Sequence, residues 1–279
     1  MIQFLAIGHV TLDQTEHGRL PGGSALYSAL FASRMGLKAG ILTSFGPDFP
    51  RGVIPPEVEL VSVPSASTTI FRHAFTNGRR ALWLLDRAAD IVAEKLPTPW
   101  ETSDLVYLCP VAGEVDARLA GAFRDATIGL GPQGWMRSMD ERGLVTPKGW
   151  DGASTVLPQS QALFVSEEDL QDEESIRDWF DQVPVGFVTR GERGATLFVN
   201  GEPYKVEGYR TDVADPTGAG DVFAAAFLIH YQRTQDAWEA AGFATAAGSL
   251  TVEGEGIQGV PDAGTLEDRW KFYRRRIPV

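Results

Sequence analysis

The sequence predicts an α/β protein with a mainly parallel central sheet, covered by helices on both faces, and a small β ribbon. Short apolar runs of strand length alternate along the chain with segments of helical periodicity. When strands and helices alternate along a chain, the strands usually pair in parallel, and the helices that join them bury both faces of the sheet. Asn77-Gly78 stands between two alternating segments, 68–75 and 80–85, and indicates a β-hairpin.

Composition limits the classes of partner. The chain has 279 residues, a formal net charge of −12 and a single cysteine, Cys109. The acidic excess argues against nucleic acid or an anionic membrane as a partner, and one cysteine without an internal disulfide is typical of a reducing cytoplasm. No apolar run approaches the ~18–20 residues that span a bilayer, and the first residues indicate a strand rather than a signal peptide. We therefore expect a cytoplasmic protein with a small-molecule partner.

The N-terminal third holds the first candidate ligand residues. Residues 4–7 form an apolar run that predicts a buried strand, and Asp13 follows shortly after it. Ligands of open α/β sheets bind beyond the carboxyl ends of the strands, so Asp13 is either a ligand-binding residue or an ordinary turn residue. Gly22-Gly23 then precedes a helical segment, 24–35, that Gly36 ends.

Two later segments give weaker predictions. Residues 138–158 contain two prolines and three glycines and indicate an insertion outside the core. The acidic run 167–174 follows a predicted strand at 162–165 and indicates the start of a helix, where negative charge favours the helix dipole.

The stretch from Asp215 to Asp221 (Asp-Pro-Thr-Gly-Ala-Gly-Asp) carries the strongest indication of chemistry, because an apolar, alanine-rich helical segment follows it at once. Glycines let successive N–H groups point into one concavity, and the start of a helix adds partial positive charge, which suits a phosphate. Asp221 stands at the rim, placed to accept a proton from an attacking hydroxyl. The alternative is a glycine-containing turn with Asp221 as a helix cap.

Asp-Pro-Thr-Gly-Ala-Gly-Asp-x-Phe resembles the C-terminal signature of the ribokinase/PfkB family of carbohydrate and nucleoside kinases. The resemblance implies a single ribokinase-like three-layer αβα domain over 1–279, with a lid made by 68–85 together with 12–20. It implies ATP and Mg²⁺ as cofactors and, in some members, a monovalent cation such as K⁺. It also places the phosphates over the glycine turn, with Asp221 as the catalytic base. The residues that would act there are Gly218, Ala219, Gly220 and Asp221.

Two further segments resemble the family's substrate motifs. Gly22-Gly23 and the small-residue helix resemble its N-terminal signature, although Tyr27 stands where many sugar kinases carry Asn. The segment 131–137 resembles its mid-chain motif, with Gly131 in place of the usual acidic residue. The substrate residues implied by this resemblance are Asp13, Gly22, Gly23, Tyr27, Gln133 and Arg137.

The same resemblance implies which residues would contact the nucleotide. A predicted strand–turn–strand at 186–195 is similar to the family segment beside the nucleotide, and Arg190 there either adds positive charge or belongs to a plain hairpin. Ser166 and Asp169 replace the Asn and Glu tied to water-mediated Mg²⁺ binding, so Asp169 is the expected metal contact through water. The glycine pattern at 254–259 lacks the context of a dinucleotide site. The implied nucleotide residues are Thr189, Arg190, Gly191, Asp215, Thr217 and Gly256.

The sequence thus predicts an alcohol phosphotransferase that uses ATP and acts on a sugar, an inositol-like polyol or a nucleoside, as a monomer or homodimer. The alternative is a nucleotide- or sugar-binding regulatory protein of the same fold. The altered positions Gly131, Ser166 and Asp169 favour that alternative slightly, whereas the intact signature around Asp221 opposes it.

Overall fold

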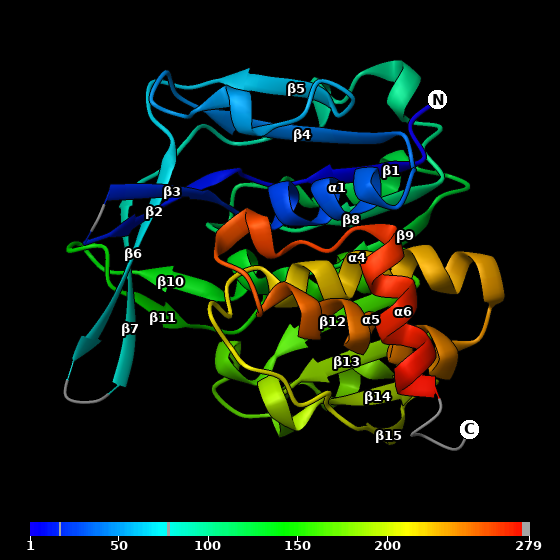
Figure 1. Cartoon of the computed structure of the whole chain (residues 1–279). Helices are drawn as coiled ribbons and strands as arrows, with labels where there is room; N and C mark the ends of the chain where they lie inside the picture. The colour runs from blue at the N-terminus through cyan, green and yellow to red at the C-terminus, as the bar shows by residue number, and fades with distance from the viewer. Residues whose placement is uncertain (17, 77–78, 275–279) are drawn as a thin grey trace.

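The computed structural model describes residues 1–16, 18–76 and 79–274. Its centre is a nine-stranded sheet in the order β15-β14-β13-β12-β9-β8-β1-β4-β5 (Figure 1). The ladder is parallel from β5 to β13 and antiparallel at β14 and β15. The strands are β1 (Phe4–Ile7), β4 (Ala39–Phe45), β5 (Glu59–Pro64), β8 (Leu105–Leu108), β9 (Thr127–Leu130), β12 (Ala162–Ser166), β13 (Val185–Thr189), β14 (Ala195–Val199) and β15 (Glu202–Val206). The predicted mainly parallel sheet is confirmed.

Both faces of this sheet are buried, as the continuous apolar strands require. Successive residues of β1 show this, because Phe4 packs into one hydrophobic cluster and Leu5 into the other. Four long helices cover the first face, toward the viewer in Figure 1: α1 (Ser24–Arg34), α4 (Ala219–Thr234), α5 (Ala237–Thr251) and α6 (Ala263–Arg274). Short turns and the one-turn helices α2 (Ala153–Val156) and α3 (Arg177–Phe180) cover the second face. Within the described residues, no helix is long and apolar enough to cross a membrane.

The helix predicted to begin in the acidic run 167–174 is wrong. The structure has short 3₁₀ turns at Glu167–Asp169 and Glu174–Ile176, and then only the single turn of α3. Glu167 and Glu173 are bound by arginines that follow β13, so the polypeptide is held against the sheet instead of continuing as a helix.

Helix α4 is anchored to the central sheet by a buried aromatic face. It lies between the sheet and α5, and its residues 222–229 are all buried. Phe227 is fully buried and meets Phe187 and Phe164, with ring centroids 4.7 and 5.7 Å away. These two rings come from β13 and β12, so aromatic packing fixes α4 against the strands that end beside its N-terminus.

A second, four-stranded sheet has the order β3-β2-β6-β7 and lies beyond the edge where the parallel strands end (Figure 1). Its strands are β2 (Thr11–Thr15), β3 (Gly18–Gly22), β6 (Thr69–Thr76) and β7 (Arg79–Asp86). The pair β2–β6 is parallel and the other pairs are antiparallel. The predicted turn at Asn77-Gly78 lies outside the described residues.

A buried polar network joins the base of this sheet to the central sheet. The imidazole of His9 contacts the Thr69 hydroxyl through Nδ1 at 2.7 Å and the Ala89 carbonyl through Nε2 at 2.9 Å. Thr69 Oγ1 in turn accepts a hydrogen bond from Ala88 N–H at 2.9 Å. The buried carboxylate of Glu114 accepts the N–H of His9 at 2.8 Å. The network therefore ties the start of β6 and the chain that leaves β7 to the end of β1.

The prediction that residues 138–158 lie outside the core is wrong in part, because Val156 and Leu157 are fully buried in the hydrophobic cluster on the second face of the central sheet. Residues 138–147 form part of a wall beside the four-stranded sheet. They contribute most of a hairpin made of β10 (Arg137–Met139) and β11 (Val145–Pro147). The hairpin meets β7 through a hydrogen bond from Leu84 N–H to the Gly143 carbonyl at 2.8 Å. Met139 and Val145 also pack with Leu82, Leu84 and Phe71 in a small hydrophobic cluster.

The packing of α4 leads to a stability prediction. Phe227→Ala removes a fully buried ring against β12 and β13, and we expect it to cost about 3–5 kcal/mol of unfolding free energy, the usual range for such a truncation. Denaturant-induced unfolding measures this. The control Trp238→Ala, at a side chain 49% exposed, should cost less than about 1 kcal/mol. Equal losses in the two variants would contradict the anchoring of α4 by its aromatic face.

Candidate active site

The N-terminus of α4 is a glycine turn at the start of a helix, the geometry that suits an anion, and we call it the anion cradle. Helix α4 begins at Ala219, directly after Gly218, which has φ of 80° in the left-handed region. A Cβ on Gly218 would also lie 2.3 Å from the ring of Tyr27, so both backbone and space require glycine. A Cβ on Gly220 would meet no heavy atom of the described chain within 4 Å. The first-turn N–H groups of a helix lack intrahelical partners and carry partial positive charge.

Asp215 holds this turn in place. Its Oδ1 accepts a hydrogen bond from Thr217 N–H and its Oδ2 accepts one from Gly256 N–H, both at 2.9 Å. The Ala214 N–H donates to the carbonyl of Val252 at 2.7 Å. Asp215 therefore joins the loop before α4 to the segment after α5. Three residues predicted to meet the nucleotide thus come together as a brace for the cradle.

Asp221 lies in the first turn of α4 and is half-buried. Burial raises the pKa of its carboxyl to about 6, and the nearby charge of Asp169 adds to the rise. A hydrogen bond from the Ser24 hydroxyl and the positive charge of Arg137 oppose that rise in pKa. A carboxylate with a pKa near 6 is ionised at neutral pH and takes up a proton more readily than an exposed one.

Gln133 and Arg137 surround Asp169. The Gln133 amide donates to the two carboxylate oxygens of Asp169 at 3.0 and 3.1 Å. The Arg137 guanidinium lies 3.8 Å from Asp169, donates to the Val111 carbonyl at 2.9 Å and stacks over the ring of Phe71. Burial raises the pKa of Asp169, and these two partners oppose that rise. The predicted substrate motif and the predicted metal contact therefore form one cluster.

Asp13 projects from β2 beside the glycine pair. A Cβ on Gly22 would lie 2.6 Å from Asp13 Oδ2, so glycine at 22 leaves room for the carboxylate. Gly23 has φ of 97°, and a Cβ there would lie 2.5 Å from the His9 carbonyl oxygen. The pair thus lets the start of α1 approach both β2 and the end of β1.

These groups share a single cavity of about 1650 Å³. Pockets for one small ligand usually measure about 300–1,000 Å³, so this volume can hold two ligands side by side. The predicted residues that line it are Asp13, Gly23, Tyr27, Gln133, Arg137, Asp169, Thr189, Arg190, Gly191, Thr217, Gly218, Ala219, Gly220 and Asp221. Gly22, Asp215 and Gly256 do not line it and support the lining residues from behind.

Tyr27 lines the cavity with very little exposed surface, since it is 1% exposed. Its ring lies under the Gly218 turn, and burial together with the charges of Asp13, Asp215 and Asp221 raises the pKa of its hydroxyl. The aromatic side chain in place of the usual Asn is therefore a floor for the cradle.

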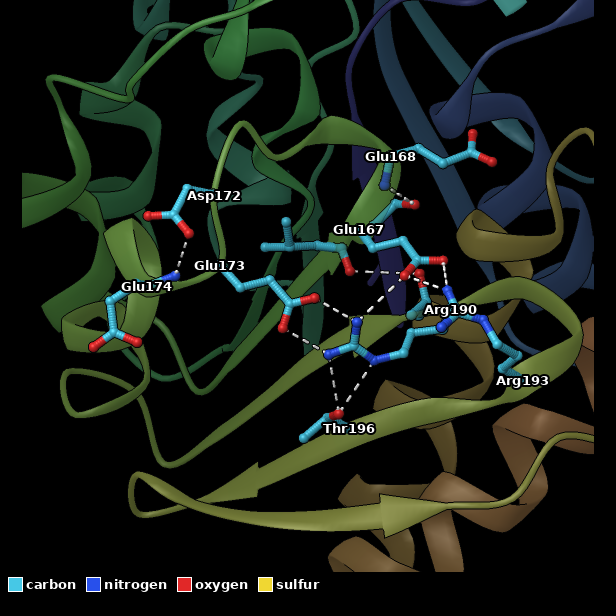
Figure 2. A network of polar contacts seen from close by, with 11 residues as sticks. Glu167, Glu168, Asp172, Glu173, Glu174, Arg190, Arg193 and Thr196 are labelled. Atoms are coloured by element: carbon cyan, nitrogen blue, oxygen red, sulfur yellow. Dashed lines mark hydrogen bonds and ion pairs between the residues drawn. The ribbon is translucent and has the colours of Figure 1, made fainter. Parts of the chain in front are cut away.

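Arg190 carries a compensated charge. Figure 2 shows its guanidinium between Glu173, Glu167 and the Thr196 hydroxyl, while Arg193 also binds Glu167. The Arg190–Glu173 pair lowers the pKa of Glu173. The network holds the ends of β12 and β13 together, and the positive charge predicted for the nucleotide is balanced by two carboxylates.

Ser24 and Tyr107 are among the lining residues that the sequence did not predict. Ser24 hydrogen-bonds Asp221 from the start of α1, and its place directly after Gly22-Gly23 was the available signal. Tyr107 lines the cavity from β8, where it looks like an ordinary residue of an apolar strand.

Comparisons with known proteins find similar kinases. Residues 136–263 match the model of the pfkB family carbohydrate kinases. A cytidine kinase of Thermococcus kodakarensis is 28% identical over 259 residues, covering 84% of this chain and 90% of that protein.

Solved structures share the fold. One is a pyrophosphate-dependent myo-inositol-1 kinase converted by two substitutions into a myo-inositol-3 kinase, with a TM-score of 0.79, 21% identity and coverage of 96% of this chain and 99% of that one. Another is a putative ribokinase II from E. coli in complex with ATP and Mg²⁺, with a TM-score of 0.75, 19% identity and coverage of 99% and 100%. Together with the signature at the start of α4, these matches show similarity to the pfkB family of carbohydrate kinases over residues 136–263, and they identify the protein as a phosphotransferase with a hydroxyl group as acceptor.

Proposed function

We propose that the protein transfers the γ-phosphoryl group of ATP to a hydroxyl of a sugar, an inositol-like polyol or a nucleoside, with Asp221 as the catalytic base. The observation that carries this proposal is the position of Asp221 in the same helical turn as the anion cradle. A carboxylate with a pKa near 6 accepts the hydroxyl proton, while the adjacent N–H groups face the charge that develops on the phosphoryl oxygens.

The acceptor occupies the side of the cavity near β2 and the 131–137 segment. Asp13 accepts hydrogen bonds from its hydroxyl groups, and Gln133 and Arg137 donate to its oxygens. Gly22 and Gly23 make room for Asp13, and Tyr27 sets the height of the cradle above the acceptor. A polyhydroxylated ligand suits this wall, because donors and acceptors alternate around it.

The donor occupies the other side, along the ends of β12 and β13. Gly218, Ala219 and Gly220 hold the transferring phosphoryl group, and Thr189 and Gly191 form the wall beside the nucleotide, positioned by Arg190 and its carboxylate partners. Mg²⁺, when bound with ATP, neutralises charge on the phosphates. Asp169, whose carboxylate oxygens accept hydrogen bonds from Gln133, would meet this Mg²⁺ through water.

The four-stranded sheet acts as a lid in this proposal. Phe71 and Leu82 from its strands line the same cavity as Asp221. A sheet that covers bound acceptor excludes water, which would otherwise compete as the phosphoryl acceptor.

The first experiment is a panel assay of phosphoryl transfer. ADP release from ATP·Mg²⁺ is measured with sugars, inositols and nucleosides, and the same acceptors are tested with pyrophosphate. The cytidine kinase supports the nucleosides, and the myo-inositol kinase supports the polyols and the second donor. Acceptor-dependent ADP release supports the proposal. Tight binding of acceptors without transfer from either donor would contradict it and favour a binding protein.

Asp221→Asn tests the base. We expect turnover to fall by about 10²–10⁴-fold, the usual contribution of a general base. The nearby exposed Asp212→Asn is the matched control and should keep the wild-type rate. Full activity of Asp221→Asn would show that Asp221 is not the catalytic base and acts only as a helix cap.

The same variant should be more stable than wild type at neutral pH. The folded protein holds the Asp221 proton more tightly than the unfolded chain, so ionisation costs stability as the pH rises from about 4 to about 6, and the full cost remains above pH 6. A pKa raised from 3.8 to about 6 corresponds to a cost of up to about 3 kcal/mol. Thermal unfolding at pH 5 and pH 7.5 measures the gain.

The pH dependence follows from the same pKa. We expect kcat/KM for the acceptor to fall about tenfold per pH unit below about pH 6, where Asp221 becomes protonated, and to level off above it. A pH–rate profile between pH 4.5 and 8 provides the measurement. A profile that is flat from pH 5 to pH 7 would rule out Asp221 as the group whose ionisation controls the rate.

Substitutions at two glycines of the cradle should affect stability and catalysis differently. Gly220 lies in the helix and faces open space, so Gly220→Ala should keep or slightly raise stability while its methyl group lowers kcat/KM for ATP by about 10–10²-fold. Gly218 has a positive φ, and a Cβ there would clash with the Tyr27 ring. Gly218→Ala should therefore lower the free energy of unfolding by more than about 1 kcal/mol. Wild-type activity of Gly220→Ala would place the phosphoryl group elsewhere.

A further inference from the structure

Tyr107 is a buried aromatic residue of the acceptor wall that the proposed mechanism does not use. It is the third residue of β8, is 3% exposed and faces the same hydrophobic cluster as α4. Its ring meets the edge of Phe164 with centroids 6.2 Å apart. Its surface nevertheless lines the cavity beside Asp221. The core therefore fixes the ring while the side chain reaches the site.

Gly131 is complementary to this side chain. Its φ of −112° is one that any residue adopts, so the backbone does not require glycine there. A Cβ on Gly131 would lie 2.3 Å from the Tyr107 hydroxyl oxygen and 3.0 Å from Cζ. The space where a side chain at 131 would begin is thus already filled by the Tyr107 hydroxyl.

The charges around the hydroxyl decide its chemistry. Burial and the nearby carboxylates of Asp221 and Asp169 raise the pKa of Tyr107 well above its ordinary value. The hydroxyl therefore keeps its proton at every pH at which the enzyme works. A protonated phenol offers one hydrogen-bond donor, whereas a carboxylate at this place would offer acceptors only.

We propose that Tyr107 is a specificity-determining residue of the acceptor site, whose hydroxyl donates a hydrogen bond to an acceptor oxygen close to the hydroxyl that is phosphorylated. This inference rests on the proposed kinase function. The Tyr107 hydroxyl can occupy this place only because residue 131 is glycine, since any side chain there would displace the hydroxyl. The acceptor class is one with an oxygen at that position, as a free hydroxyl, a ring oxygen or a carbonyl.

Tyr107→Phe is the direct test, because it removes a single oxygen atom. We expect KM for the best acceptor of the panel to rise roughly three- to tenfold, as for the loss of one neutral hydrogen bond, with KM for ATP unchanged and kcat within about twofold. Tyr231→Phe is the matched control on the far part of α4 and should leave both constants unchanged. A merely structural role for Tyr107 would lower thermal stability without moving the acceptor KM alone.

Deoxy analogues of the same acceptor locate the contact. For the analogue that lacks the bonded oxygen, the wild-type enzyme should lose about as much affinity as Tyr107→Phe does, and combining the two changes should add little further loss. Additive losses for every analogue would overturn the proposed hydrogen bond.

The pairing with Gly131 has a test that needs no activity. Gly131→Ala should lower the unfolding midpoint in the wild-type background, and it should lower it less in the Tyr107→Phe background, where the 2.3 Å approach to the oxygen is gone. Equal shifts in the two backgrounds would overturn the pairing.

Failure of this inference can be told from failure of the kinase proposal. If the protein is an active kinase and Tyr107→Phe leaves KM for the acceptor unchanged, the proposed function stands and the inference about Tyr107 is wrong. Absence of both binding and turnover across the whole panel overturns the two together. Calorimetric titration of the acceptor without ATP gives the binding constant independently of turnover.

Discussion

The contact between Gly218 and the ring of Tyr27 is the constraint on which the site depends. A left-handed glycine seated on a buried ring sets the direction in which α4 begins. The hydrogen bonds of Asp215 then lock that turn to the segment after α5, and aromatic packing along α4 locks the helix to the sheet. Asp221 receives its position from these contacts, which is why a single turn can present an anion site and a carboxylate together.

The site concentrates negative charge at a cost in stability. The charge of Asp169 raises the energy of ionised Asp221, and the positive charge of Arg137 offsets part of this repulsion. The Ser24 hydroxyl and the Gln133 amide supply the remaining polar partners. Such an arrangement resembles other active sites, where perturbed carboxylates are retained for their chemistry rather than for the fold.

The sequence carried the fold class and the local parts of the site, and it missed what depends on distant contacts. The alternation of strands and helices sufficed for the parallel sheet, and the 215–221 signature sufficed to locate the glycine turn at the start of α4, whose phosphate-binding role stays a prediction. Nothing local identifies Tyr107, because its partner Gly131 lies on the neighbouring strand's extension. The partners of Arg190 were equally hidden, since they follow a different strand. The helix expected at 167–174 failed for the same reason: ion pairs formed across the sheet outweighed local propensity.

The β10–β11 hairpin has a mechanical consequence for the proposed lid. The attachments of the four-stranded sheet include His9 at its base, Asp48 beside Arg19 of β3, and Gly143 partway along β7. The hairpin begins at Arg137, so a load on β7 is transmitted directly to a residue of the acceptor wall. Strands β6 and β7 bend most easily beyond these attachments. If the sheet is a lid, as proposed, its opening would bend the distal parts of these strands, and a larger displacement would also move Arg137.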